Sequence, residues 1–271
     1  LKMTQEMTAL KTAIIERFGT PCAVLDLDLV ARNIVTAQDR CDAVGLANRP
    51  HIKTHKSPVL ANLQIKAGAR GITCQKLGEA EVMANAGITD IIIATNLLGA
   101  ARSGRLAKLQ RRLPLKVCAD NTVSLSAYSQ AAAQAGRPMD VLIECETGQK
   151  RAGVETPKEA LTLAKVIRDD PHLNFAGLLF YPSLDSWSQT QVFFDHTAAG
   201  LSDLGLSAKI VSTGGTPNFS HIGSLKGATE HRAGTCIFND RMMIKAGVAT
   251  LEDCAFQVFT SVVSRAGSER G

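Results

Sequence analysis

Short apolar runs recur along the chain and alternate with longer stretches in which apolar residues return at helical spacing. Runs such as 91–93 and 141–143 are continuously apolar, which is typical of strands buried on both faces of a parallel sheet. The pattern predicts strands at residues 23–27, 47–52, 71–74, 90–94, 115–119, 141–145, 175–181, 209–213 and 229–232.

Helix signals lie between these runs. Ser57-Pro58 and Thr156-Pro157 each place a proline directly after a capping hydroxyl, and Gly87 and Gly136 stand where helices should end. The pattern predicts helices at 57–67, 77–86, 121–135, 156–169 and 191–204. Strands follow one another every ~20–35 residues, the spacing that βα units require.

The eight runs from 47 to 232 predict a TIM (β/α)8 barrel. An open doubly wound sheet is the alternative, but no G-x-G-x-x-G motif follows an early strand. The run at 255–264 is rich in Val, Phe, Thr and Ser and suits a strand outside the barrel. We therefore expect an N-terminal segment at 1–46 whose strand belongs to a second domain, a barrel at 47–250, and the start of a largely missing β-rich domain at 251–271.

Composition narrows the classes of partner. The net charge is +5, only 4% of residues are aromatic, and the basic residues are mixed with acidic ones. Without a basic stripe and interleaved aromatics, nucleic acid is not the expected partner. Mild positive charge suits an anionic small molecule or a phosphate-bearing cofactor.

The cysteines and the apolar runs bear on the compartment. Seven widely spaced cysteines, with no C-x-x-C pair, argue against a disulfide framework or a zinc knuckle. No apolar run approaches the ~20 residues of a membrane span, and the first ten residues lack the apolar core of a signal peptide. We expect a cytoplasmic protein that does not enter a membrane.

Lys53 is the first candidate for chemistry. It lies in the run 49–56, at the end of the first barrel strand, beside His51, His55 and Lys56. Barrel chemistry occurs at strand ends, and nearby cations lower a lysine pKa, which favours imine formation with an aldehyde. One alternative is a solvated loop lysine. Another is a metal pair formed by the two histidines, whose spacing suits a helix that the preceding proline disfavours.

The loop after the seventh barrel strand is the second candidate. It reads Ser212-Thr213-Gly214-Gly215-Thr216-Pro217. Glycines let backbone N–H groups approach a phosphate, threonine hydroxyls add donors, and barrel phosphate sites commonly use the loops after strands seven and eight. An ordinary glycine-rich turn is the alternative.

Three further polar residues follow other strands. Gln75 ends the second barrel strand, Arg151 lies in the loop after the fifth, and Tyr181 ends the sixth. An arginine there can donate to a phenolate or carboxylate; taken singly, each residue could instead be an ordinary surface or loop group. Around one barrel mouth, with an imine-forming Lys53 and a phosphate loop, they describe a pyridoxal phosphate (PLP) site.

At these residues the chain resembles the fold-type III PLP enzymes. It is similar to their D-threonine aldolase and D-serine dehydratase branch, related to the alanine racemase N-terminal barrel, and most of all to the low-specificity D-threonine aldolases. The matching stretches cover most of the chain: Thr20-Pro21, Asp26-Leu27-Asp28, Arg32-Asn33, 49–56, 73–81, 148–154, 213–217 and Phe238-Asn239-Asp240.

The resemblance implies a role for each candidate. Lys53 would form the Schiff base with PLP and take part in catalysis. The other cofactor contacts would come from Gln75, Arg151 and Tyr181 at the ring or its oxygen, and from Thr213, Gly214 and Gly215 at the phosphate.

The implied activity is that of a lyase. It would cleave D-β-hydroxy amino acids of the D-threonine type to glycine and an aldehyde by retro-aldol chemistry, with small D-amino acids as substrates and a homodimer as the assembly. Two alternatives remain: a PLP-dependent D-serine or 3-hydroxyaspartate dehydratase, and a PLP-binding carrier without catalysis.

The resemblance also implies a divalent metal, Mn or Mg, held by a histidine and an acid or cysteine in the family's C-terminal domain. The chain shows no such motif, so no metal ligand is assigned, and Pro182-Ser183-Leu184 replace a histidine that relatives often carry. On this interpretation the chain is a truncated enzyme and would be inactive by itself.

Overall fold

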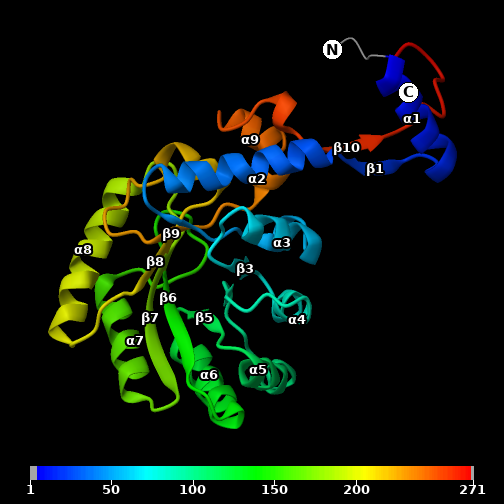
Figure 1. Ribbon diagram of the computed structural model, residues 1–271. Coiled ribbons are helices and arrows are strands. Elements are labelled where there is room, and N and C mark those ends of the chain that lie inside the picture. The colour runs from blue at the N-terminus through cyan, green and yellow to red at the C-terminus, as the bar shows by residue number, and fades with distance from the viewer. Residues whose placement is uncertain (1–4, 270–271) are drawn as a thin grey trace. The chain divides into compact units, whose positions relative to one another are not determined.

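The computed structural model describes residues 5–269, and within them it separates two compact units, of which Ile34–Cys236 is the larger. The larger unit contains eight strands: β2 (Ala47–Asn48), β3 (Ile72–Cys74), β4 (Ile91–Ile93), β5 (Lys116–Ala119), β6 (Met139–Cys145), β7 (Leu173–Phe180), β8 (Ile210–Thr213) and β9 (Glu230–His231). All are parallel to their neighbours, in the order β2-β9-β8-β7-β6-β5-β4-β3. This is the predicted TIM-like α/β barrel (Figure 1).

The two ends of this order meet, which closes the circle. The N–H of Thr73 donates to the carbonyl of Pro50 at 2.8 Å, and the N–H of Arg70 donates to the carbonyl of Asn48 at 2.9 Å. His51 and Thr73 also form a parallel bridge. Because parallel strands in a closed barrel all end at the same rim, the residues that follow them surround one mouth.

The helices of this unit occupy the connections between strands. They are α3 (Pro58–Lys66), α4 (Leu77–Asn85), α5 (Ala100–Arg112), α6 (Thr122–Ala135), α7 (Pro157–Asp169) and α8 (Trp187–Asp203), with short 3-10 turns η1 (Ile52–Thr54), η2 (Thr216–His221) and η3 (Thr235–Ile237). Figure 1 shows α4 to α8 packed around the outside of the strands.

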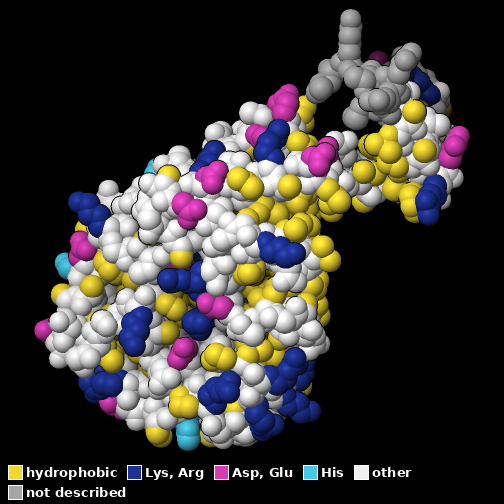
Figure 2. All heavy atoms as spheres, viewed as in Figure 1, with side chains coloured by type: hydrophobic (Ala, Val, Ile, Leu, Met, Phe, Trp, Pro, Cys, Tyr) yellow, Lys and Arg dark blue, Asp and Glu magenta, His cyan; other side chains and the backbone are white. Residues whose placement is uncertain are grey.

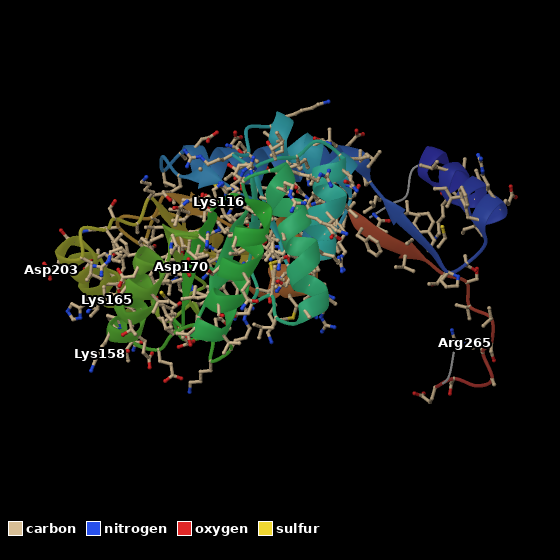
Figure 3. The ribbon with its side chains drawn as sticks, turned by 90° about the horizontal axis from the view of Figure 1, so that it is seen from below. Lys116, Lys158, Lys165, Asp170, Asp203 and Arg265 are labelled. Carbon is tan, nitrogen blue, oxygen red and sulfur yellow. The ribbon has the colours of Figure 1, made fainter. Side chains whose placement is uncertain are left out.

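The helix starts that the sequence predicted carry the expected caps. The Ser57 hydroxyl accepts from the N–H of Leu60, and Thr156 and Glu159 form a capping box at the start of α7. The apolar side of α7 is buried, whereas Lys158 and Lys165 project outward (Figure 3). The spacing of these residues fixes which face of α7 meets the sheet.

Alternation along the strands divides the core into two layers. Ile91, Ile93 and Val117 belong to the large cluster that packs beneath the helices, whereas Ile92 and Cys118 belong to a small cluster on the opposite face of the sheet. Successive side chains of a strand point to opposite faces, so this second cluster fills the inside of the barrel, as in other barrels of this type.

The barrel also holds a partly buried charge network, which we call the floor network: Arg49, Asp90, Lys116, Ser212 and Glu230. The Arg49 guanidinium lies 2.7 Å from Glu230 through Nε and 2.7 Å from Asp90 through Nη1. Lys116 Nζ lies 2.9 Å from Asp90, and the Ser212 hydroxyl donates to Glu230 at 2.5 Å. Asp90, Lys116 and Glu230 stand at strand starts, so this network lies at the end of the barrel opposite the mouth.

The other unit is smaller. It contains α1 (Gln5–Phe18), a two-stranded antiparallel sheet of β1 (Cys22–Leu25) and β10 (Phe256–Phe259), α9 (Arg241–Lys245) and the 3-10 turn η4 (Leu251–Asp253). Arg32, near the middle of α2 (Leu27–Asp42), pairs with Asp253 at 2.9 Å. The domain boundaries expected at 46 and 250 stay a prediction.

The strands match the prediction closely, and the helices less so. Each of the nine strand predictions coincides with an observed strand, and the run 255–264 contains β10. The last predicted helix was wrong at its start, because α8 begins at Trp187 rather than at residue 191. The helices α1, α2, α5 and α9 were not predicted.

Three further observations concern membrane helices, surface charge and the cysteines. A helix long and apolar enough to cross a bilayer does not occur among residues 5–269. On the face shown in Figure 2, acidic groups lie between several of the basic side chains of the barrel unit. All seven cysteines are free thiols.

Candidate active site

Lys53 lies in the 3-10 turn η1, in the segment that follows β2, as the sequence predicted. The turn is capped by its own neighbour, because the N–H of Lys53 donates to His51 Nδ1 at 3.3 Å. Partial burial lowers the pKa of Lys53, and the positive charges of Arg151 and Arg232 lower it further. A larger fraction of this amine is therefore neutral and nucleophilic near pH 7 than for an ordinary lysine.

The two histidines that flank Lys53 serve the local fold. His55 Nδ1 accepts from the N–H of Ser57 at 3.0 Å, and its Nε2 lies 3.2 Å from Gln64 Oε1. Since both of its ring nitrogens already have protein partners, His55 is not placed as one half of a metal pair with His51. Among residues 5–269, no group of three or more His, Cys, Asp or Glu side chains could hold a metal ion.

Gln75 follows β3 and faces His51. Its Nε2 donates to the carbonyl of Ala94 at 3.4 Å. Burial lowers the pKa of His51 to about 3, and a side-chain hydrogen bond with Gln75 opposes that shift. The backbone N–H of Gln75 donates to Glu79 at 2.7 Å, so the start of α4 holds this residue. Gln75 also lines a cavity of about 590 Å³ together with Lys56 and Asn96. The Gln75 amide therefore stands at the rim, and the His51 ring connects it to the backbone of Lys53.

Arg151 and Tyr181 come from neighbouring loops and meet at the mouth. The Arg151 guanidinium lies over the Tyr181 ring, 5.2 Å from its centroid, and 3.9 Å from Glu144. The loop that carries Arg151 closes back on its own strand, since the N–H of Glu146 donates to the carbonyl of Val154 at 2.9 Å. This closure holds Arg151 above the end of β6, within electrostatic range of Lys53.

The loop Thr213-Gly214-Gly215 after β8 has the properties of an anion cradle. A Cβ on Gly215 would lie 2.6 Å from Tyr181 Cε2, so only glycine allows this close approach. The Thr213 hydroxyl is buried without a hydrogen-bond partner. No hydrogen bond within residues 5–269 uses the backbone N–H of Gly214, Gly215 or Thr216. Four donors around two glycines are thus left free for an anion.

Two buried charged residues at the mouth were missed by the sequence analysis. Arg232 follows β9, donates to the carbonyl of Phe180 at 2.7 Å, and keeps a buried Nη1 without a partner. Glu144 lies near the end of β6, where burial raises its pKa and Arg232 and Arg151 oppose that shift. The sequence could have indicated Arg232, because it is the last residue of the predicted strand 229–232 and the strand-end rule that selected Lys53 applies to it as well.

The predicted residues therefore converge. The backbone of Lys53 contacts His51, which bonds to Gln75. The charge of Arg151 acts on the Lys53 amine. Arg151 stacks on Tyr181, and Tyr181 packs against Gly215. We call Lys53, Glu144, Arg151, Tyr181 and Arg232 the mouth cluster. The roles assigned to the individual residues stay predictions.

Comparison with known proteins identifies the family. The alanine racemase N-terminal domain family matches residues 25–242. The chain belongs to this family. Similar proteins within it are a D-threonine aldolase of Arthrobacter, 45% identical over 61% of this chain, and the D-threo-3-hydroxyaspartate dehydratase of Delftia, 35% identical over 90%. Among solved structures, D-threonine aldolase from Filomicrobium marinum is 32% identical, with a TM-score of 0.83 over 92% of this chain and 71% of that chain.

These relatives place this alanine racemase N-terminal domain in the D-threonine aldolase and D-serine dehydratase branch of the fold-type III PLP enzymes, as the motifs predicted. The chain spans 44% of the Arthrobacter protein and 67% of the Delftia protein.

The residues at the mouth fit PLP. A phosphate needs several donors that point at one place, and the loop at 213–216 leaves a buried hydroxyl and three N–H groups unused. An aldehyde needs a neutral amine, and the pKa of Lys53 is lowered. A ring oxygen needs a cationic donor, and Arg151 is held in electrostatic range of Lys53.

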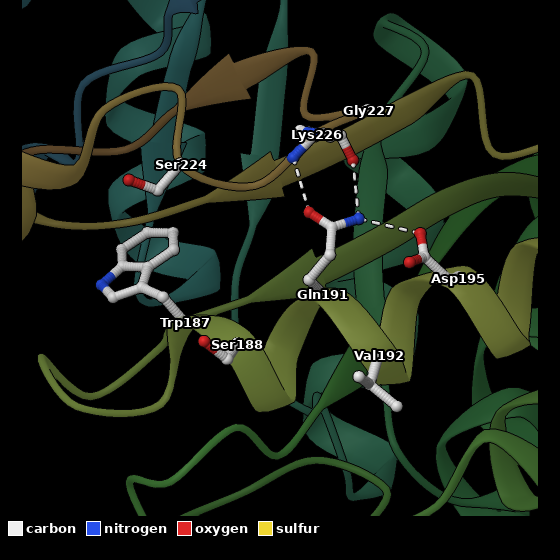
Figure 4. Close-up of a pocket in the computed structure, with 8 residues that line it drawn as sticks. All are labelled: Trp187, Ser188, Gln191, Val192, Asp195, Ser224, Lys226 and Gly227. Atoms are coloured by element: carbon white, nitrogen blue, oxygen red, sulfur yellow. Dashed lines mark hydrogen bonds between the residues drawn. The ribbon is translucent and has the colours of Figure 1, made fainter.

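A larger hollow, of about 790 Å³, lies elsewhere on the barrel (Figure 4). It is lined by Trp187, Ser188, Gln191, Val192, Asp195, Ser224, Lys226 and Gly227. Gln191 bonds to both backbone groups of Lys226 and to Asp195, so its polar atoms are used in joining α8 to the loop before β9. None of the predicted site residues lines this hollow, and chemistry is better assigned to the mouth.

Proposed function

We propose that this chain forms the PLP-binding barrel of a lyase that cleaves D-β-hydroxy amino acids of the D-threonine type to glycine and an aldehyde. The observation that carries the proposal is the stacking of Arg151 on Tyr181, which packs against a loop with four unused donors. Arg151 is also close enough to lower the pKa of the Lys53 amine. When bound, PLP supplies a ring that accepts the electrons of the breaking Cα–Cβ bond.

Each residue then has a task. Lys53 would hold the cofactor aldehyde and, as a neutral amine, could take up or return a proton at Nζ. Thr213, Gly214 and Gly215 would bind the phosphate. Arg151 would donate to the ring oxygen. These tasks follow from the positions of the groups and from the direction of the Lys53 pKa.

A divalent metal, Mn or Mg, completes the proposal. It would lower the pKa of the substrate β-hydroxyl, with ligands from outside residues 5–269. We also propose a homodimer in the cytoplasm, acting on small D-amino acids rather than on nucleic acid or membranes.

A dehydratase is the second candidate. The Delftia dehydratase aligns with 90% of this chain, whereas the Arthrobacter aldolase aligns with 61%. Loss of the β-substituent as water would give a keto acid and ammonia in place of glycine and an aldehyde. A carrier that binds PLP without turnover is the remaining alternative.

Lys53→Ala tests the proposal, with Lys56→Ala as its matched control. Lys56 is three residues away and exposed, and it has no assigned task. Purified full-length protein should show the visible absorbance of a lysine-bound PLP, which K56A should keep and K53A should lose. Activity should fall by at least ~1,000-fold in K53A only, because this substitution removes both the group that attaches the cofactor and the group that carries the proton.

Products and metal dependence then separate the candidates. D-threonine, D-serine and D-threo-3-hydroxyaspartate should be assayed with and without Mn2+. Glycine plus aldehyde supports the aldolase, and a keto acid plus ammonia supports the dehydratase. Bound PLP with no product leaves the carrier, and full activity in K53A would reject the mechanism.

A further inference from the structure

His231 lies directly behind the predicted phosphate loop. It is the second residue of β9, is fully buried, and its Nε2 stands 3.2 Å from the carbonyl oxygen of Gly215. Its other nitrogen, Nδ1, is buried without a hydrogen-bond partner. The sequence analysis gave this histidine no role.

The contact fixes the tautomer of the ring. A carbonyl oxygen only accepts, so Nε2 must carry the proton that is donated to Gly215. Burial first and the Arg232 charge second lower the pKa of His231 to about 4. The ring is therefore neutral near pH 7, with the hydrogen on Nε2 and a bare Nδ1.

The loop is built against this ring. Gly214 has a φ of +78°, and a Cβ at that position would lie 1.9 Å from Cε1 of His231. On another side the imidazole stacks with Phe219 at 5.8 Å, and Phe219 in turn lies under the Arg40 guanidinium at 4.9 Å. The ring is thus packed in place, and Gly214 has no side chain because the ring occupies that space.

The direction of one carbonyl decides the direction of the next N–H. In a trans peptide unit the C=O and the N–H point in opposite directions. The Gly215 carbonyl accepts from His231 and also from the N–H of Asn218 at 3.0 Å. The N–H of Thr216, in the same peptide unit, therefore points away from the His231 ring, and no described residue accepts from it.

We propose that His231 is a positioning residue for the anion cradle, which holds the Gly215 carbonyl outward so that the loop presents N–H groups, and no carbonyl, to the cofactor phosphate. The inference rests on the proposed PLP function and adds a residue to it. His231 touches the loop and not the ligand, so its effect should concern the phosphate alone.

The test compares PLP with pyridoxal, which has the same aldehyde and ring but no phosphate. In His231→Phe a ring still fills the space beside Gly214 and Phe219, but the donor to Gly215 is gone. We expect the dissociation constant for PLP to rise about tenfold, the equivalent of one lost hydrogen bond, and that for pyridoxal to stay within about twofold. His231→Gln keeps an N–H donor and should recover part of the PLP affinity.

Each outcome decides a separate point. Equal PLP binding by wild type and H231F, or equal losses for PLP and pyridoxal, would overturn the role of His231. Nitrogen NMR of the wild-type imidazole adds a measurement that needs no variant: protonation on Nδ1 at pH 7 would also overturn it. If wild type itself bound PLP no better than pyridoxal, the proposed function would fail at the phosphate loop, and this inference with it.

Discussion

Both ends of the barrel carry charged side chains, but these are paired differently at the two ends. In the floor network, Arg49 is 1% exposed and Glu230 is fully buried, and ion pairs or hydrogen bonds of 2.5–2.9 Å join the five side chains. In the mouth cluster the cations Lys53, Arg151 and Arg232 outnumber the carboxylate of Glu144. The salt bridge between Arg151 and Glu144 there is longer, at 3.9 Å.

The difference separates a structural network from a binding site. Buried charges that satisfy one another need no further partner. At the mouth, cations stand beside unused donors, such as Arg232 Nη1 and the Thr213 hydroxyl, and an anion could pair with both. The floor network therefore joins strands at one end of the barrel, and the proposed anion site lies at the other.

Removal of Arg49 should have the largest effect on stability. In Arg49→Met, Glu230 and Asp90 lose their principal partner, and Glu230 has no access to water. We expect the free energy of unfolding to fall by about 3–5 kcal/mol, as when one partner of a buried pair is removed. Urea denaturation measures it, and Arg105→Ala, which breaks the exposed Arg105–Glu81 pair, should lower it far less. A loss below 1 kcal/mol in R49M would contradict the comparison.

Acid should weaken the mouth before it weakens the floor. The pKa of His231 is lowered to about 4 from an ordinary value of 6.5, so the unfolded chain binds the extra proton first. The share of stability that His231 contributes, about 3 kcal/mol, should therefore be lost as the pH drops from about 6.5 to about 4. His51 and His55, whose pKa values are also lowered, should add to the decline in the same window. The pKa of Asp90 is lowered by Arg49 and Lys116 in spite of its burial, so its contribution is lost only below its ordinary value of 3.8.

Unfolding free energies measured across this pH range, for wild type and H231F, check the assignment. The decline between pH 6.5 and 4 should become shallower in H231F, while the decline at lower pH should stay. An unchanged slope in the upper window would show that the ring is not neutral in the fold.

The smallest expected effect concerns reactivity. In Arg151→Gln the largest electrostatic cause of the lowered Lys53 pKa is removed, so that pKa should rise and less of the amine should be neutral at pH 7.5. We expect the rate of imine formation with pyridoxal to fall a few-fold and to recover at higher pH. A stopped-flow absorbance profile measures this. If R151Q forms the imine at the wild-type rate at every pH, Arg151 does not lower the pKa of Lys53.

The sequence predicted the parts that depend on local pattern. Short runs, several of them continuously apolar, predicted the barrel strands, and the strand-end rule placed Lys53, Gln75 and Tyr181 at one mouth. The helix α5 was missed because it is polar and begins after Gly99 without a side-chain cap.

Other features depend on contacts that no local pattern encodes. Nothing near Arg49 in the sequence indicates that Glu230 will meet it, since 181 positions separate them. His231 reads as one polar residue in a strand, and its place behind the glycine loop follows only from the pairing of β8 with β9.

The backbone around Lys53 has a consequence for motion. The amides of Lys53, His55, Lys56 and Ser57 all donate hydrogen bonds, to His51, twice to the carbonyl of Ile52, and to His55. The main chain there is therefore a fixed pivot. If the amine moves from one partner to another, only rotations of the lysine side chain can carry it. We expect these four amides to exchange hydrogen slowly while the amine stays free to turn.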